Sequence, residues 1–258
     1  MINKKIIIVG GGRWARTIIK TLLSNFNENL IIYIHSPNNF HSIEQWSMNI
    51  CKDSKIKILK NIDDIKLIKP SAGIIVNKAK DHFKFAKKLL EMKIPTLIEK
   101  PITTKYNDAC ELYKLAKRTS TYIAPALVFS FSGYLNDIAK SINSDEKINS
   151  FIINWSDPDN EIIDGEKKRY DPETTVVEDC LPHFLSLLRI FTSLTIVNYD
   201  SLIFQRGGSK ISLNFKSDLK KLRFNISRKA ATRERLIIIN TKTAEYQINF
   251  SNELPVIK

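Results

Sequence analysis

The chain has 258 residues, 43% hydrophobic and 26% charged, a balance typical of a soluble globular protein with one or two domains. No apolar run approaches the roughly 20 residues that a membrane-spanning helix needs, so we expect a cytoplasmic protein with no membrane partner. The three cysteines stand far apart without metal-type spacing, which predicts reduced thiols and no metal site.

The formal net charge of +13 is compatible with nucleic-acid binding, or with anionic small ligands in a lysine-rich chain. Basic residues are scattered among acidic ones, and only the stretch 206–235 is markedly basic. That stretch lacks the clustered aromatic side chains on which bases stack. We therefore favour a small-molecule substrate and expect no nucleic-acid partner.

The first apolar segment ends in three glycines. Residues 6–9 predict a buried parallel strand and residues 14–23 an amphipathic helix, with a tight turn between them. Gly10, Gly12 and Ala15 fit G-x-G-x-x-G/A, the turn that lets a dinucleotide pyrophosphate approach the backbone at a helix N-terminus. The alternative is a glycine turn in an ordinary α/β protein.

The segment after the second predicted strand, residues 30–34, bears on the cofactor. An NAD-selective enzyme usually carries an acidic residue there to bind the ribose hydroxyls, whereas this chain has His-Ser-Pro-Asn. Ser36, with His35 as a second candidate, supplies a donor in place of the carboxylate, which favours NADP as the cofactor over NAD. Arg13 pairs with the 2′-phosphate, stacks on adenine, or is simply a solvated arginine.

The next elements alternate between strand and helix. This order predicts a doubly wound parallel sheet, in which ligands bind at the carboxyl ends of the strands. Asn77 and Lys100 both follow such ends. The predicted strands are residues 55–59, 73–76 and 96–98, and the clearest helix is 82–90.

Four features occur in one order: the glycine turn with Arg13, His82, Glu99-Lys100-Pro101, and Asp179 with His183 four residues later. In this order and spacing the chain resembles the Gfo/Idh/MocA-type oxidoreductases, which include glucose-fructose oxidoreductase and inositol dehydrogenases. The resemblance covers the first 105 or so residues well and 123–190 by pattern. It implies an N-terminal Rossmann domain and a second, α+β domain with a large, mostly antiparallel sheet.

We accordingly expect a dinucleotide-binding domain at residues 1–122 and a substrate-binding and oligomerisation domain at 123–258. Family members usually run longer, so the resemblance implies a shortened second domain. It also implies a homodimer or homotetramer formed through the outer face of the second sheet. Alternating apolar segments agree with that sheet: residues 148–155, 196–204, 209–215, 222–226, 236–239 and 244–250.

Three residues are the catalytic candidates. Hydride transfer places charge on an oxygen or nitrogen, which calls for a positive group and a proton carrier. Read through the family, Lys100 takes the first role, His183 acts as acid and base, and Asp179 orients His183 or holds a substrate hydroxyl. Alternatively, Lys100 is a solvated strand-end residue and Asp179 a helix N-cap. Because Pro182 suits only a first turn, we expect the helix to begin near Asp179.

The remaining candidates bind cofactor or substrate. Arg169 and Tyr170 lie in a loop that either covers the pocket and contacts an anionic or polar substrate, or is simply solvated. Trp155 is either sheet core or a pocket wall. The cofactor-binding candidates are Gly10, Gly12, Arg13, Trp14, His35, Ser36, Asn77 and Glu99.

The predicted function is NAD(P)-dependent hydride transfer to or from a carbonyl or secondary alcohol of a sugar, cyclitol or nucleotide-linked sugar. One alternative is reduction of a C=N bond in a biosynthetic intermediate, which the same lysine and histidine can serve. Another is a cofactor-binding regulator without catalysis, against which the presence of Lys100 and His183 argues. The family often has glycines just before the aspartate and a second aspartate three residues after the histidine. This chain has neither, which weakens the transfer of a sugar-binding mode.

Overall fold

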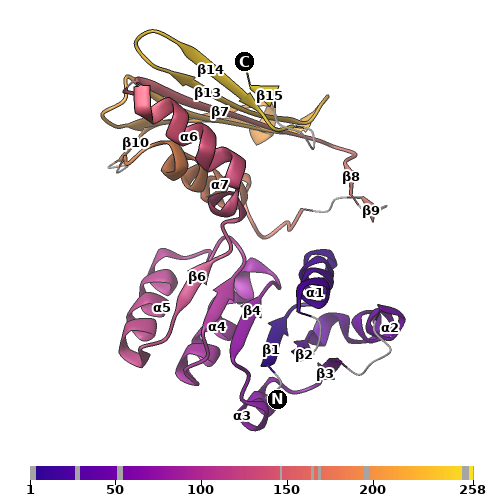
Figure 1. The fold of residues 1–258 in the computed structure, drawn as a ribbon. Coiled ribbons are helices and arrows are strands. Elements are labelled where there is room, and N and C mark those ends of the chain that lie inside the picture. The colour runs from indigo at the N-terminus through magenta and orange to yellow at the C-terminus, as the bar shows by residue number, and fades with distance from the viewer. Residues whose placement is uncertain are drawn as a thin grey trace. The chain divides into compact units, whose positions relative to one another are not determined.

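The computed structural model describes residues 4–26, 30–50, 55–145, 147–163, 166–167, 170–194, 198–251 and 256–257. The chain forms two compact units, Met1–Ala126 (unit 1) and Leu127–Lys258 (unit 2), each described by itself (Figure 1). The strand β6 (Ile123–Pro125), which we expected at the start of the second domain, pairs within unit 1.

Unit 1 is built on a six-stranded sheet in which every pairing is parallel. The order is β3-β2-β1-β4-β5-β6, so the direction of winding reverses between β1 and β4. This confirms the predicted doubly wound parallel sheet. The strands before β6 are β1 (Lys4–Val9), β2 (Leu30–His35), β3 (Ile56–Leu59), β4 (Ala72–Ile75) and β5 (Thr96–Ile98).

Helices cover both faces of this sheet because its strands are apolar on both sides. Ile8 faces α1 (Arg13–Asn25) and α2 (Phe40–Ile50), whereas its neighbour Ile7 faces α4 (His82–Glu91) and α5 (Tyr106–Thr119). Consecutive strand residues point to opposite faces, so one apolar run fills two cores. The short α3 (Ile65–Ile68) precedes β4.

Unit 2 is built on a seven-stranded sheet in the order β10-β11-β12-β7-β13-β14-β15. Only the β12–β7 pairing is parallel among the described pairings, which confirms the predicted, mostly antiparallel sheet. A separate hairpin pairs β8 (Ile162–Ile163) with β9 (Glu166–Lys167). The large sheet comprises β7 (Ser150–Pro158), β10 (Asn198–Gln205), β11 (Lys210–Lys216), β12 (Lys221–Ala230), β13 (Glu234–Asn240), β14 (Glu245–Asn249) and β15 (Val256–Ile257).

The two helices α6 (Gly133–Asp145) and α7 (Val176–Phe191) pack on one face of this sheet (Figure 1). Phe151 of β7 and Phe184 of α7 are fully buried in that core. Side chains alternate along the strands, so every second residue points toward the helices. This alternation places several polar residues of β7, β12 and β13 on the helix-covered face.

Candidate active site

The glycine turn has the geometry that a dinucleotide site requires. Gly10 has φ +133°, and a Cβ atom there would lie 2.8 Å from the carbonyl carbon of Val76, so only glycine fits this close approach. Gly12 is the N-cap of α1, makes no side-chain cap, and a Cβ atom there would meet nothing within 4 Å. No acidic residue stands in the first turn of α1. The helix N-terminus therefore offers N–H donors and an open approach to an anion.

The loops after β4 and β5 are held together by a buried histidine. His82, 1% exposed, lies with Nδ1 2.8 Å from the Pro101 carbonyl oxygen and Nε2 3.2 Å from that of Asn77. Burial lowers the pKa of His82, and the contacts with the backbone carbonyls oppose that effect in part. The Oδ1 atom of Asn77 is buried and accepts no hydrogen bond from the described residues. An acceptor so placed fits a donor group of the cofactor.

Trp14 and Glu99, both predicted cofactor residues, contact each other. The indole Nε1 of Trp14 donates to Glu99 Oε2 at 2.9 Å, which joins the start of α1 to the segment after β5. Lys100 follows directly and is half-buried. Gly10, Asn77 and Glu99 thus lie at the carboxyl ends of β1, β4 and β5, three adjacent strands. This edge is where ligands bind doubly wound sheets.

His35, the last residue of β2, and Ser36, which follows it, have side chains in different surroundings. His35 is 5% exposed, with Nδ1 3.1 Å from the Leu59 carbonyl oxygen and its ring against Phe85. Burial is the main cause of its lowered pKa. Ser36 lies beside the glycine turn: a Cβ atom on Gly11 would come within 2.6 Å of its Oγ. Of this predicted pair, Ser36 and not the imidazole is next to the phosphate-binding turn.

In unit 2, α7 begins earlier than expected. Thr175 caps it: its Oγ1 accepts from the Glu178 N–H at 3.2 Å, and Glu178 Oε2 accepts from the Thr175 N–H at 2.8 Å. This capping box satisfies the N-terminal donors three residues before the position we expected. The prediction that the helix begins near Asp179 is therefore wrong, and Pro182 lies inside the helix, not in its first turn. Asp179 is not the N-cap.

Aromatic rings surround His183. The Trp155 ring stacks on the imidazole with centroids 5.4 Å apart and an interplanar angle of 12°, while Phe129 meets it edge-on at 5.3 Å. Trp155 is 7% exposed and belongs to the core, which decides between the two roles considered for it. The imidazole plane is therefore fixed by packing.

Asp179 pairs with Arg228, a residue that sequence reasoning missed. The Arg228 Nη2 donates to Asp179 Oδ2 at 2.8 Å, and the guanidinium stacks over the Tyr170 ring at 4.0 Å. A signal for Arg228 existed: it follows Leu222, Phe224 and Ile226 in the alternating, inward-facing series of β12. Tyr170 is thus placed beside Arg228, the ion-pair partner of a catalytic candidate. Arg169 lies outside the described residues.

A second, fully buried ion pair lies beneath Trp155. Arg235 and Asp157 have side chains 4% and 5% exposed and are directly paired. Arg235 also donates to the Ser156 and Glu234 carbonyl oxygens at 2.6 and 2.7 Å, and it lies 3.7 Å from the Trp155 ring centroid. The pair therefore supports the ring that stacks on His183. Neither residue was singled out from the sequence.

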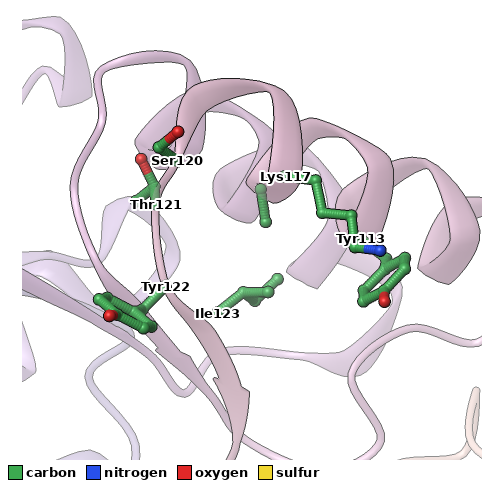
Figure 2. Close-up of a pocket in the computed structure, with 7 residues that line it drawn as sticks. Tyr113, Lys117, Ser120, Thr121, Tyr122 and Ile123 are labelled. Carbon is green, nitrogen blue, oxygen red and sulfur yellow. The ribbon is translucent and has the colours of Figure 1, made fainter.

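One cavity of about 410 Å³ lies elsewhere in unit 1, between the end of α5 and the start of β6 (Figure 2). It is lined by Tyr113, Ala116, Lys117, Ser120, Thr121, Tyr122 and Ile123. Its residues precede or begin β6, so it lies at the amino end of that strand. It is distinct from the edge formed by the carboxyl ends of β1, β4 and β5.

Within the described ranges, no group of three or more histidine, cysteine or acidic residues is arranged to hold a metal ion. Over the same ranges, no helix is both long enough and apolar enough to cross a membrane.

Comparison with known proteins agrees with this geometry. A family model described as an oxidoreductase family with an NAD-binding Rossmann fold, Gfo/Idh/MocA, matches residues 4–126. No curated protein matches the sequence.

Solved structures share the fold of the whole chain at low sequence identity. UDP-N-acetylglucosamine 3-dehydrogenase from Acidithiobacillus ferrooxidans superposes with a TM-score of 0.78 at 15% identity, covering 100% of this chain and 80% of that one. The myo-inositol 2-dehydrogenase from Lactobacillus plantarum gives 0.79 at 15% identity, covering 98% and 81%. An NAD-binding protein from Listeria innocua gives 0.79 at 14%, covering 99% and 76%.

Proposed function

Residues 4–126 match the model of the NAD-binding Gfo/Idh/MocA oxidoreductase family, and on that premise we propose that the chain is such an oxidoreductase and what it acts on. The proposed reaction is hydride transfer between nicotinamide and a carbonyl or secondary alcohol of a sugar, cyclitol or nucleotide-linked sugar. Structural relatives named as a UDP-N-acetylglucosamine dehydrogenase and an inositol dehydrogenase support this substrate class. The observation that carries the proposal is the uncapped N-terminus of α1 behind Gly10 and Gly12.

The residues present fit a nicotinamide dinucleotide. The pyrophosphate would lie against the N–H groups at the start of α1, and the buried Asn77 Oδ1 would accept from a donor group of the cofactor. When bound, the nicotinamide supplies or accepts the hydride. The protein must then stabilise charge on the substrate oxygen and move one proton.

The candidates for these tasks are Lys100, His183 and Asp179. Lys100 would hydrogen-bond the substrate oxygen as charge develops on it. His183, whose ring plane is fixed by Trp155 and Phe129, would carry the proton. Asp179 would accept a hydrogen bond from a substrate hydroxyl or orient His183. Tyr170 contacts Arg228, which supports a place for it near the substrate.

We propose NADP as the preferred cofactor, with Ser36 and Arg13 as the residues nearest a 2′-phosphate. His35 is left out because its imidazole is buried against Leu59 and Phe85. Ser36→Asp should weaken NADPH binding relative to NADH, since a carboxylate repels the phosphate and can accept from ribose hydroxyls. An unchanged ratio would mean that the phosphate is held elsewhere.

The first test is a fluorescence titration of the purified protein with NADPH and NADH, followed by a panel of keto-sugars, inositols and nucleotide sugars. Binding of either nucleotide with turnover of a panel member supports the proposal. Turnover of cyclic imines alone would favour C=N reduction. Binding without any turnover would favour a regulator, and binding of neither nucleotide by folded protein would overturn the proposal.

We further propose that the chain forms a homodimer or homotetramer through the sheet face that α6 and α7 leave uncovered. Amides span that face: Asn225 Nδ2 donates to Asn154 Oδ1 at 2.8 Å, and Asn225 Oδ1 accepts from Ser212 at 2.8 Å. Half-buried Ile152 and Ile238 lie on the same face. Light scattering after size-exclusion chromatography tests this, and a monomer at micromolar concentration would overturn it. A cytoplasmic location stays a prediction.

A further inference from the structure

The contact between Asp179 and Arg228 places a cation against a catalytic candidate. Their side chains are 31% and 15% exposed, so solvent screens the pair only in part. The nitrogen-to-oxygen distance of 2.8 Å is that of a charge-assisted hydrogen bond. A guanidinium at this distance favours the ionised form of a carboxyl group.

One contact positions the guanidinium, and a second holds the backbone that carries it. The Tyr170 ring lies beneath it at 4.0 Å, and the Arg228 backbone N–H donates to the Ser209 carbonyl oxygen at 2.7 Å. In the parallel register, Arg228 stands beside Asp157 of β7. Asp157, however, is paired with Arg235 from the other side. Within the described residues, Arg228 therefore pairs with Asp179 and Arg235 with Asp157.

Other titratable groups lie on the same helix and on the strands near it. Glu178 on α7 is taken up by the capping box with Thr175. His183, one turn further along α7, is enclosed by Trp155 and Phe129. Other described titratable residues on these elements are Cys180 on α7, Tyr170 before it, Asp157 on β7 and Arg235 on β13.

We propose that Arg228 is a positioning residue that keeps Asp179 an ionised hydrogen-bond acceptor throughout the reaction. Because the carboxylate stays ionised, it accepts from a substrate hydroxyl or from His183 and does not donate a proton. Proton donation then falls to Lys100 or His183. This division of tasks rests on the proposed oxidoreductase function, whereas the pairing itself does not.

The pairing is tested by carbon-detected NMR titration of protein labelled in its aspartate carboxyl groups, with Asp179→Asn to assign the resonance. In the wild type, we expect Asp179 to titrate below the ordinary aspartate range, and in Arg228→Met its midpoint should rise by about one pH unit or more. In Arg228→Lys the Asp179 midpoint should rise less, because lysine retains the positive charge. The matched control is Arg223→Met, which removes an arginine from the opposite face of the same strand, where it donates to Asn214 at 2.6 Å.

Two results would overturn the proposal. One is a wild-type Asp179 midpoint at or above the ordinary aspartate range, which needs no variant and so does not depend on Arg228→Met folding. The other is an equal rise of the Asp179 midpoint in Arg228→Met and in Arg223→Met.

The role in catalysis needs a second readout. With a substrate from the panel, Arg228→Met should move the acid limb of the kcat/KM profile to higher pH without changing NADPH affinity. A uniform loss at every pH would indicate a merely structural role and contradict the proposal. If the NMR result holds but the wild type turns over no substrate, the pairing stands and the proposed function fails.

Discussion

The two units build their candidate sites in opposite ways. In unit 1 the candidate cofactor site, at the carboxyl ends of the strands, is made largely by backbone. It consists of a position that only glycine can occupy, an uncapped helix N-terminus, and carbonyl oxygens that contact His82. In unit 2 the site is made by side chains that meet across the sequence. Asp179 and Arg228 are 49 residues apart, and Asp157 and Arg235 are 78 apart.

This difference shows which parts of a site a fold supplies by itself. A doubly wound sheet brings the carboxyl ends of all its strands to one edge. Residues at that edge therefore lie close together without specific contacts between their side chains. An antiparallel sheet has no such common edge, and its site depends on which side chains alternate inward. The cofactor site should therefore survive side-chain changes that abolish the chemistry.

The sharpest test of that comparison is Lys100→Ala. Turnover should fall by about 10²- to 10⁴-fold, the range for loss of a proton-transfer or charge-stabilising group, while NADPH affinity stays within about twofold. Steady-state kinetics and fluorescence titration measure the two effects. Lys114→Ala, an exposed lysine on α5, is the control. Full activity in Lys100→Ala would refute the assignment of Lys100.

In unit 2, Arg235→Met should cost about 3–5 kcal/mol of the free energy of unfolding, because it leaves Asp157 buried without its cation. Adding Asp157→Leu should recover much of that loss, since an apolar pair of similar volume is often no less stable than a buried ion pair. Urea denaturation measures both. Equal stability of the wild type and Arg235→Met would show that this pair is not a support of the site.

Substitutions at the two glycines of the turn should separate effects on stability from effects on cofactor binding. Gly10→Ala should lower the free energy of unfolding by about 1–3 kcal/mol, because φ is +133° and the new Cβ would contact Val76. Gly12→Asp should leave stability unchanged or slightly higher, since aspartate is a good N-cap, yet weaken NADPH binding by about tenfold or more through repulsion of phosphate. Calorimetry and nucleotide titration distinguish them. Comparable losses of stability in the two variants would contradict this reading.

The smallest effect expected is on the pH dependence of unit 1. The pKa of His82 is lowered in the folded chain, so the unfolded chain binds more protons as pH falls below the ordinary histidine pKa of 6.5. The contribution of neutral His82 to the free energy of unfolding is therefore fully present above pH 6.5. It is lost progressively as pH falls from 6.5 to the pKa of the folded chain. Each pH unit between the two pKa values is worth roughly 1.4 kcal/mol.

Urea titrations at pH 7.5 and 5.5 measure that loss. It should be smaller in His82→Gln than in the wild type, whereas the exposed His41→Gln should behave as the wild type does. An identical loss in His82→Gln would assign the pH dependence to other groups.

Much of unit 1 was predictable because its signals are local. The continuous apolar run before Gly10 predicts a strand buried on both faces, and the spacing of apolar residues in 14–23 predicts the helix after the turn. The direction of His35 was not predictable, since a strand-end imidazole can turn outward or inward. The core around Phe85 and the Leu59 carbonyl decided it.

In unit 2, alternation predicted the strands but not their partners. The start of α7 was misjudged because Pro182 was given more weight than Thr175 and Glu178, whose spacing is a capping box. From the sequence, Arg228 and Arg235 were interpreted only as part of the markedly basic stretch 206–235. Their inward register, which follows from β12 and β13 pairing with β7, made them buried partners of aspartates.

The amino-acid sequence alone thus determined the order of elements, the parallel sheet, the glycine turn and the Glu-Lys-Pro segment, because each depends on spacing within a few residues. Only the tertiary structure decided which charges meet, that Trp155 stacks on His183, and that Asp179 faces a guanidinium. Those contacts follow from strand register and from how α7 packs on the sheet. They reflect the burial of a whole core and not any local pattern.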